Sequence, residues 1–222
     1  MRALIRFGKQ PRLRFISHLD LQRFFQRAVN RTGLPIAYTQ GFNPHPVMSF
    51  GSALALGWTS EYEIIDIKLS APIGRIRAEE AIRAALPADL PVLEVRMIED
   101  RHPAPMALVR MSDYRVKLEG PTAGAVISQI PGFLARDTVT TVKKTKSGER
   151  QINARAMVIG MEPAEDAFAV RLMLTEQASI KPDLLVGLLA EQAGVEPPEA
   201  RIHRTLLLGE DAEGSLRPLM MI

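Results

Sequence analysis

Apolar residues at every second position mark several strands within the first hundred residues. Ala3, Ile5 and Phe7 alternate with arginines, and residues 62–69 alternate in the same way. Because successive side chains of a strand point to opposite faces of a sheet, this period of two predicts strands with one buried face. Residues 21–29 instead carry apolar side chains at helical spacing. The chain is therefore expected to combine strands and helices in an α+β fold.

The first helix has a defined start and a defined end. Ser17 is followed three residues later by Asp20, which is the pattern of a capping box. Gly33 and Pro35 are typical of the end of a helix. We therefore expect the helix to begin at His18, where free backbone N–H groups and the positive end of the helix dipole favour an anion.

The other segments of the first hundred residues complete a β-α-β-β-α-β order. Residues 36–38 and 47–58 are extended, 78–86 has helical spacing, and 93–97 alternates as a last strand. This order is the ferredoxin-like arrangement, in which two helices pack on one face of a four-stranded antiparallel sheet. The other face of that sheet is expected to stay available for a ligand.

A second unit with the same order follows a linker. Residues 101–105 contain two prolines that continue neither a helix nor a strand ladder. Beyond them we expect a weak helix from Pro121 that Pro131 ends, and an extra hairpin around the basic turn 143–150. The prediction is two ferredoxin-like (βαββαβ) units in tandem, residues 1–100 and 107–222.

Positive charge is concentrated at the start of the chain. Residues 1–60 contain eight Lys and Arg side chains and a single acid, Asp20, although the whole chain carries only +3 at pH 7. Arg23, Arg27 and Arg31 repeat at every fourth position, so they share one line of the helix and repel one another unless something negative is near. Such a surface favours a polyanion, an acidic protein surface or an anionic ligand. A merely solvated basic face is the alternative.

The loop 38–46 carries the densest set of polar side chains. Two prolines fix the backbone around His45, Gly41 admits a positive φ, and Gln40 and Asn43 supply amide donors and acceptors. We expect such a loop to hold a ligand, although an elaborate turn in which His45 caps a carbonyl is also consistent with the sequence. The aromatic side chains available for stacking on bases are Tyr38, Phe42 and Trp58.

Several kinds of chemistry are excluded or weakly supported by the residues present. The chain has no cysteine, which excludes disulfides, catalytic thiols and clusters held by its own thiolates. His18, Asp20 and His45 have a loose spacing for metal ligands, so no metal site is expected. Gly-x-Ser-x-Gly, phosphate-loop and dinucleotide fingerprints are absent. His18 and His45 are the candidates for a general acid and base.

The sequence also carries no sign of a membrane segment. No apolar run reaches the roughly 18 residues that a transmembrane helix needs, and the first residues lack the apolar stretch of a signal peptide. We therefore expect a cytoplasmic protein that makes no contact with a membrane.

Several motifs resemble a known family, the radical SAM-associated proteins also called DUF2344. The matching residues are Arg14-Phe15-Ile16-Ser17-His18-Leu19-Asp20, Leu34-Pro35 to Tyr38, Gln40-Gly41-Phe42-Asn43-Pro44-His45-Pro46, Ser49-Phe50 and Ser60-Glu61-Tyr62-Glu63. Later segments that resemble the family are Glu149 to Met157, where Arg155 fits the pattern but Ala156 and Met157 do not, and Arg201-Ile202 with Arg204-Thr205.

The resemblance implies an accessory role. Members stand alone or follow a radical S-adenosylmethionine domain in longer chains, and radical SAM chemistry needs an iron-sulfur cluster on three cysteines. This chain has none, so S-adenosylmethionine and the cluster are expected only on a partner, and no cofactor is expected on this chain.

Three functions remain open at this point. The first is a non-catalytic module that works with a separate radical SAM enzyme and binds RNA or a ribosome-related substrate through its basic surface. The second is an RNA-processing or phosphotransfer enzyme that uses His18 and His45, although enzyme activity of the chain alone is the weaker expectation. The third is a protein-docking module without nucleic-acid binding. The residues expected to bind the ligand are His18, Arg23, Arg27, Arg31, Gln40, Asn43, His45 and Arg155.

Overall fold

The first strand and the first helix lie where the sequence patterns predict them. In the computed structural model, strand β1 spans Arg2–Lys9 and helix α1 spans His18–Asn30. Ser17 is the N-cap of α1, and its hydroxyl oxygen accepts a hydrogen bond of 3.2 Å from the backbone N–H of Asp20. The Ser17 hydroxyl in turn donates to the Asp20 carboxylate at 2.7 Å. The predicted start of this helix is confirmed.

The chain divides into two compact units. Unit 1 comprises Met1–Val109 and Leu207–Ile222, and unit 2 comprises Arg110–Leu206. The structure describes residues 1–145 and 148–222. The first boundary lies close to the expected linker, whereas the end of the chain groups with unit 1 and not with the second half of the sequence.

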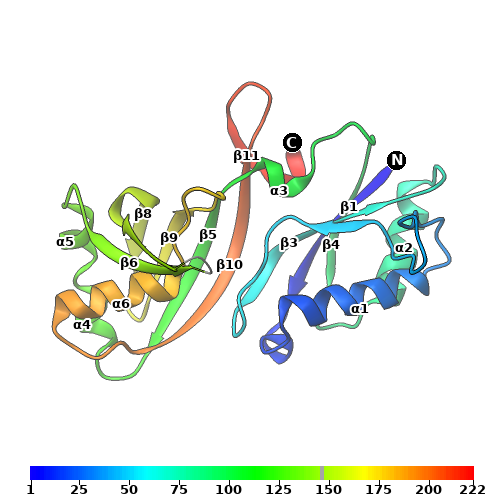
Figure 1. Cartoon of the computed structure of the whole chain (residues 1–222). Coiled ribbons are helices and arrows are strands. Elements are labelled where there is room, and N and C mark those ends of the chain that lie inside the picture. Colours follow the sequence, from blue (N-terminus) through cyan, green and yellow to red (C-terminus); the bar gives the residue numbers. More distant parts are fainter. Residues whose placement is uncertain (146–147) are drawn as a thin grey trace. The chain divides into compact units, whose positions relative to one another are not determined.

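Unit 1 is an α+β unit in which the helices α1 and α2 connect strands of one sheet (Figure 1). Its strands pair in the order β4-β1-β3-β10, while β2 pairs with β3 and β11 with β10. The pairs β1 with β3, β1 with β4 and β2 with β3 are antiparallel. Besides β1 and α1, its elements are η1 (Pro11–Leu13), β2 (Met48–Phe50), β3 (Thr59–Lys68), α2 (Arg75–Ala85), β4 (Val92–Ile98), α3 (Pro105–Leu108), the end of β10, β11 (Leu216–Pro218) and η3 (Leu219–Met221).

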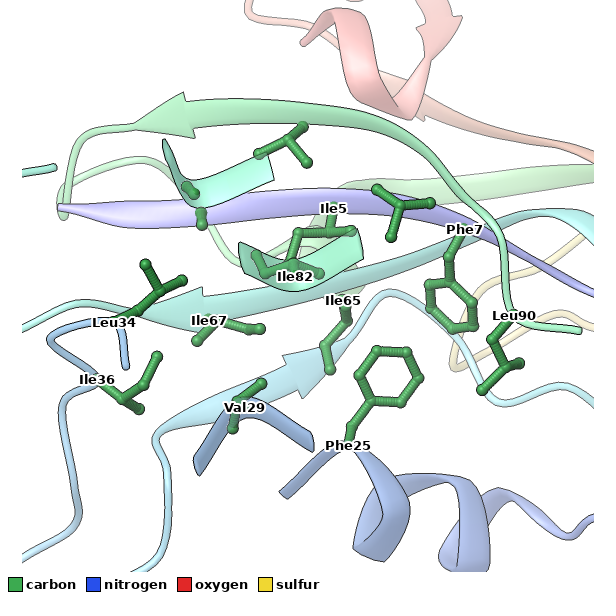
Figure 2. Close-up of a cluster of buried hydrophobic side chains, with 14 of the residues drawn as sticks. Ile5, Phe7, Phe25, Val29, Leu34, Ile36, Ile65, Ile67, Ile82 and Leu90 are labelled. Carbon is green, nitrogen blue, oxygen red and sulfur yellow. The ribbon is translucent and has the colours of Figure 1, made fainter. Parts of the chain in front are cut away.

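The core of unit 1 lies between one face of this sheet and the helices α1 and α2. Ile5 and Phe7 of β1 pack in one cluster with Phe25 of α1 and Ile82 of α2 (Figure 2). The rings of Phe7 and Phe25 are 4.8 Å apart between centroids. Burial of these side chains fixes the buried side of α1, which leaves the opposite side of the helix in solvent.

The other face of the sheet is partly covered, whereas the sequence predicts it to be open. Arg96 of β4 donates to the carbonyls of Met220 at 2.9 Å and Ile222 at 2.6 Å, and the Met220 backbone N–H donates to the Tyr62 hydroxyl at 3.4 Å. Leu219 is only 1% exposed. The end of the chain therefore packs on the sheet face opposite α1 and α2, with its apolar residues buried there.

Unit 2 is built from the same kinds of element. Its strands pair in the order β10-β5-β9-β8, and the pairs β5 with β9 and β9 with β8 are antiparallel. Its elements are β5 (Val109–Glu119), α4 (Ala123–Ile127), α5 (Ile130–Leu134), β6 (Thr140–Thr145), β7 (Gly148–Asn153), η2 (Arg155–Met157), β8 (Val158–Pro163), β9 (Ala167–Met173), α6 (Pro182–Ala193) and β10 (Glu199–Glu210).

Two details of unit 2 depart from or refine the sequence prediction. Pro131 was expected to end a helix, but it lies in the first turn of α5, where the missing N–H group costs no helical hydrogen bond. The expected hairpin is present as β6 and β7, which form a separate two-stranded sheet. Lys146 and Ser147 of its basic turn lie outside the described residues.

Within the described residues, no helix is both long and apolar enough to cross a membrane.

The buried end of the chain gives a first prediction. Replacing Leu219 by Ala should lower the free energy of unfolding by about 2–5 kcal/mol, because it leaves a cavity on the sheet face. Chemical denaturation monitored by circular dichroism measures this change. Met221 is the matched control, since its side chain is 73% exposed and Met221→Ala should change the same quantity by less than about 0.5 kcal/mol. Equal effects of the two substitutions would mean that the end of the chain does not cover the sheet.

Candidate functional site

The three arginines of α1 lie on its solvent side. Leu21, Phe25, Ala28 and Val29 are buried against the core, whereas Arg23, Arg27 and Arg31 are exposed. Arg23 has only a long contact of 3.5 Å with Asp20, and both side chains are largely in water. An exposed pair of this kind neutralises little of the charge that a ligand would meet. The arginine face of α1, meaning Arg23, Arg27 and Arg31, is therefore present as the spacing predicts.

The loop 38–46 is closed at its base by backbone and side-chain hydrogen bonds. The Thr39 N–H donates to the carbonyl of His45 at 2.9 Å, and the His45 N–H donates to the Thr39 hydroxyl at 3.0 Å. Gly41 has a φ of +125°, a conformation that other residues rarely adopt. The loop is thus a built turn. The side chains that it exposes to solvent are Gln40, Phe42, Asn43 and His45.

A single hydrogen bond attaches this loop to the arginine face of α1. The Tyr38 hydroxyl donates to the side-chain oxygen of Asn30 at 2.7 Å. Asn30 is three residues after Arg27 and directly before Arg31, so it shares the exposed side of the helix with Arg27. The loop therefore begins beside the C-terminal half of the arginine face. Neither Asn30 nor Thr39 was expected from the sequence to take part, because no local pattern links residues that far apart.

Phe42 is the most exposed aromatic side chain of this region. Its relative exposure is 112%, which means that it stands out from the loop with no cover. Trp58, another residue considered for stacking on bases, is buried and cannot serve. Tyr38 keeps a partly exposed ring, but its hydroxyl is used to anchor the loop. Of the three aromatic candidates, Phe42 is the one whose two ring faces are open.

His18 lies at the opposite end of α1 from this loop. Residues His18–Asn30 extend about 18 Å along the helix axis, at about 1.5 Å per residue. The His18 ring meets the ring of Phe50 edge to face, with 5.0 Å between centroids. His45 belongs to the loop attached at Asn30. The structure therefore does not bring the two imidazoles together as one acid-base pair.

The surroundings of His18 favour its neutral form. Burial of the imidazole lowers the pKa of His18 below its ordinary value, the Lys9 ammonium lowers the pKa further, and the Glu63 carboxylate opposes the shift. Lys9 and Glu63 are themselves buried. Burial also lowers the pKa of Lys9, again against the attraction of Glu63. This buried cluster was missed because Lys9 was counted as surface charge, although it continues the alternation of Ile5 and Phe7.

The basic residues of β1 do not belong to the candidate binding surface. Arg2 makes a bidentate ion pair with Asp66, with a shortest distance of 2.6 Å. Arg6 lies 3.4 Å from Glu94 and its guanidinium covers the ring of Tyr62 at 4.9 Å. The positive character of the first sixty residues is therefore smaller at the surface than the sequence suggests, and α1 and the segment before it carry what remains.

Arg155 lies in unit 2 and has a local structural use. Its guanidinium donates to the carbonyl of Leu134 at 3.1 Å and to the carbonyl of Val158 at 2.8 Å. These bonds join α5 to the start of β8. The described contacts therefore account for Arg155 without a ligand.

In the part of the chain that the structure describes, no group of three or more His, Asp or Glu side chains could hold a metal ion. Because the chain has no cysteine, it holds no iron-sulfur cluster on thiolates of its own.

The fold and this site define an α+β protein with a basic helix face and an attached polar loop. A family described as uncharacterized proteins conserved in bacteria, DUF2344, matches residues 2–182. The chain belongs to this family. No curated protein matches it.

One solved structure with a similar arrangement is titled "Crystal Structure of a Cbf5-Nop10-Gar1 Complex". The similarity covers 92% of this chain and 48% of that one, with 12% sequence identity and a TM-score of 0.46. This chain thus spans about half the length of the chain that it matches.

The lowered pKa of His18 gives a second prediction. The unfolded chain takes up a proton at His18 near the ordinary pKa, while the folded chain resists protonation until a lower pH. The free energy of unfolding should therefore fall as the pH drops from about 6.5 toward the folded pKa. The His18→Gln variant should lack this part of the pH dependence, in denaturation curves recorded from about pH 5 to 8. A difference between the two proteins that is constant over this range would contradict the prediction.

Proposed function

We propose that this protein is an RNA-binding accessory module that works with a separate radical SAM enzyme. The observation that carries the proposal is the hydrogen bond from Tyr38 to Asn30, which attaches the loop 38–46 to the arginine face of α1. In the proposal, the guanidinium groups of α1, the amides of the loop and the Phe42 ring act together as one exposed binding surface. The proposal also includes an RNA or ribosome-related substrate and a radical SAM enzyme as the partner.

Single-stranded RNA fits this combination of side chains. A line of arginines can follow the phosphates, and an exposed aromatic ring can stack on an unpaired base. Phe42 offers such a ring, and the amides of Gln40 and Asn43 beside it can donate to and accept from base edges. His45 closes the same loop and adds a further polar group. A purely electrostatic surface would need none of these neighbours.

The covered sheet face of unit 1 supports this placement. Ferredoxin-like sheets often receive nucleic acid on the face that carries no helix. In unit 1 Leu219 and Met220 are buried against part of that face, so we place the RNA on the helix side and the loop. The strand orders β4-β1-β3 with β2, and β10-β5-β9-β8, support the proposal that each unit is a ferredoxin-like βαββαβ unit.

The enzyme alternative is less well supported than the binding module. It requires His18 and His45 at one reacting atom, whereas they lie toward opposite ends of α1. The radical step needs a cluster held by cysteines, and the chain has none. We therefore propose that the redox chemistry belongs to the partner and that this chain holds or presents the substrate.

A salt titration tests the proposal directly. The probe is a fluorescent single-stranded RNA of about 12 nucleotides, within the usual site sizes for such proteins. Binding measured by anisotropy between about 50 and 200 mM KCl should weaken with salt, with a logarithmic slope near −2 for three arginine-phosphate contacts. The triple variant Arg23→Gln, Arg27→Gln, Arg31→Gln should lose most of this slope.

Two further variants separate stacking from charge. Phe42→Ala should weaken binding by about 1–3 kcal/mol, which is at least fivefold, and should leave the salt slope nearly unchanged. Arg77→Gln removes the same charge from an exposed site on α2 and should change the affinity by less than about twofold. The proposal fails if the RNA does not bind, if salt has no effect, or if the triple variant binds as tightly as the original protein.

A further inference from the structure

The segment between β1 and α1 is held in place by a buried lysine. Lys9 is only 2% exposed. Its ammonium group donates to the carbonyls of Arg14 at 3.1 Å and Ile16 at 2.9 Å. The Gly57 N–H donates to the same Arg14 carbonyl at 2.8 Å. These bonds fix the backbone on both sides of Phe15. They also bring the turn before β3 next to this segment.

Phe15 is exposed although its backbone is fixed. It is 68% exposed, and Leu19 and Leu56, on the two segments that adjoin this backbone, are 62% and 61% exposed. Leu19 follows in the first turn of α1, and Leu56 immediately precedes the residue that hydrogen-bonds to Arg14. We call these three residues the Phe15 patch. A rigid exposed aromatic residue with apolar neighbours is typical of an anchor in a protein interface, because little conformational entropy is lost when it binds.

The charges around the Phe15 patch are mainly positive. Arg12 and Arg14 are exposed, and the Arg14 guanidinium lies 4.4 Å from the centroid of the Phe15 ring. Arg23 lies one turn after Leu19. Among the described ion pairs, Asp20 lies 3.5 Å from Arg23 and Asp89 lies 4.0 Å from Arg12. Arginines therefore outnumber acids at the edge of the patch, which favours a partner with negative charge around an apolar side.

We propose that the Phe15 patch is a docking surface for an acidic, amphipathic segment of another protein. The apolar side of that segment covers Phe15, Leu19 and Leu56, and its carboxylates meet Arg12 and Arg14. Lys9 is a positioning residue in this arrangement, since it holds Phe15 out without touching the partner.

A protein segment fits this patch better than RNA does. One face of the Phe15 ring is already occupied by Arg14, and the leucines offer no surface on which a base can stack. Phe42, by contrast, has amide neighbours. The patch lies at the N-terminal end of α1 and the loop 38–46 at its C-terminal end, so both surfaces can be occupied together. This inference does not depend on the proposed RNA binding.

Model peptides provide the test on the full chain. The first probe is an amphipathic helical peptide of about 16 residues, with Leu and Phe at helical spacing on one side and Glu on the other. The second probe has the same apolar side and Lys in place of Glu. We expect the acidic peptide to bind, to shift the NMR signals of Phe15, Leu19 and Leu56, and to bind at least about tenfold more tightly than the basic peptide.

Exposed-residue variants complete the test without threatening the fold. Phe15→Ala should lower the affinity for the acidic peptide by at least about tenfold, and Leu56→Ala should lower it by a smaller factor. Ile76→Ala is the matched control, since Ile76 is equally exposed on α2 and should leave the affinity within about twofold. No binding of the acidic peptide, equal binding of both peptides, or shifts outside the patch would overturn the proposal.

The RNA probe distinguishes the remaining outcome. We expect the RNA oligonucleotide and the acidic peptide to bind together, with neither displacing the other. Displacement of the peptide by RNA, together with RNA-induced shifts at Phe15, would identify the patch as part of a nucleic-acid surface and would overturn the docking proposal. If the protein binds the acidic peptide but does not bind the RNA, only the proposed function is contradicted.

Discussion

Burial of the Lys9 ammonium is the interaction on which the segment that leads into α1 depends. A charged group taken out of water must find partners, and Lys9 finds two backbone carbonyls and the attraction of Glu63. Those carbonyls belong to the segment that leads into α1, so the buried charge fixes where the helix begins. The cap at Ser17, the exposed Phe15 and the direction of the arginine face follow from that placement.

The covered sheet face decides which surface remains for a ligand. In unit 1, β1, β3 and β4 have apolar or paired side chains on both faces: the core lies on one side and the end of the chain on the other. Leu4 of β1 and Ile64 of β3 are buried on this second side. An alternating strand pattern predicts one buried face and does not predict burial on the second. A sheet that is packed against other elements on both faces leaves little of its surface for a ligand and instead supports the helix and the loops around it. Binding groups then have to come from the helix surface and from loops attached to it.

Local patterns predicted the elements of the candidate site better than the contacts between them. The Ser17 cap, the exposed line through Arg27 and the turn at Gly41 each depend on neighbouring residues, and the structure has all three. The hydrogen bond from Tyr38 to Asn30 spans eight residues across the end of α1, and the packing of Leu219 on the sheet joins residues far apart in the sequence. Charge counting also failed at β1, because Arg2 and Arg6 find acidic partners that only the folded chain brings near.

The two ends of α1 carry similar positive charge, but the side chains that surround the arginines differ between them. At the C-terminal end, Arg27 and Arg31 lie beside a loop of amides with an aromatic ring whose faces are open. At the N-terminal end, Arg14 already covers a ring face, and the neighbours are leucines. Positive charge attracts any anionic partner from a distance, but the groups in direct contact determine which partner binds specifically. In the two proposals the first set receives unpaired bases and the second an apolar protein surface, so the length of α1 would set the spacing between the two ligands.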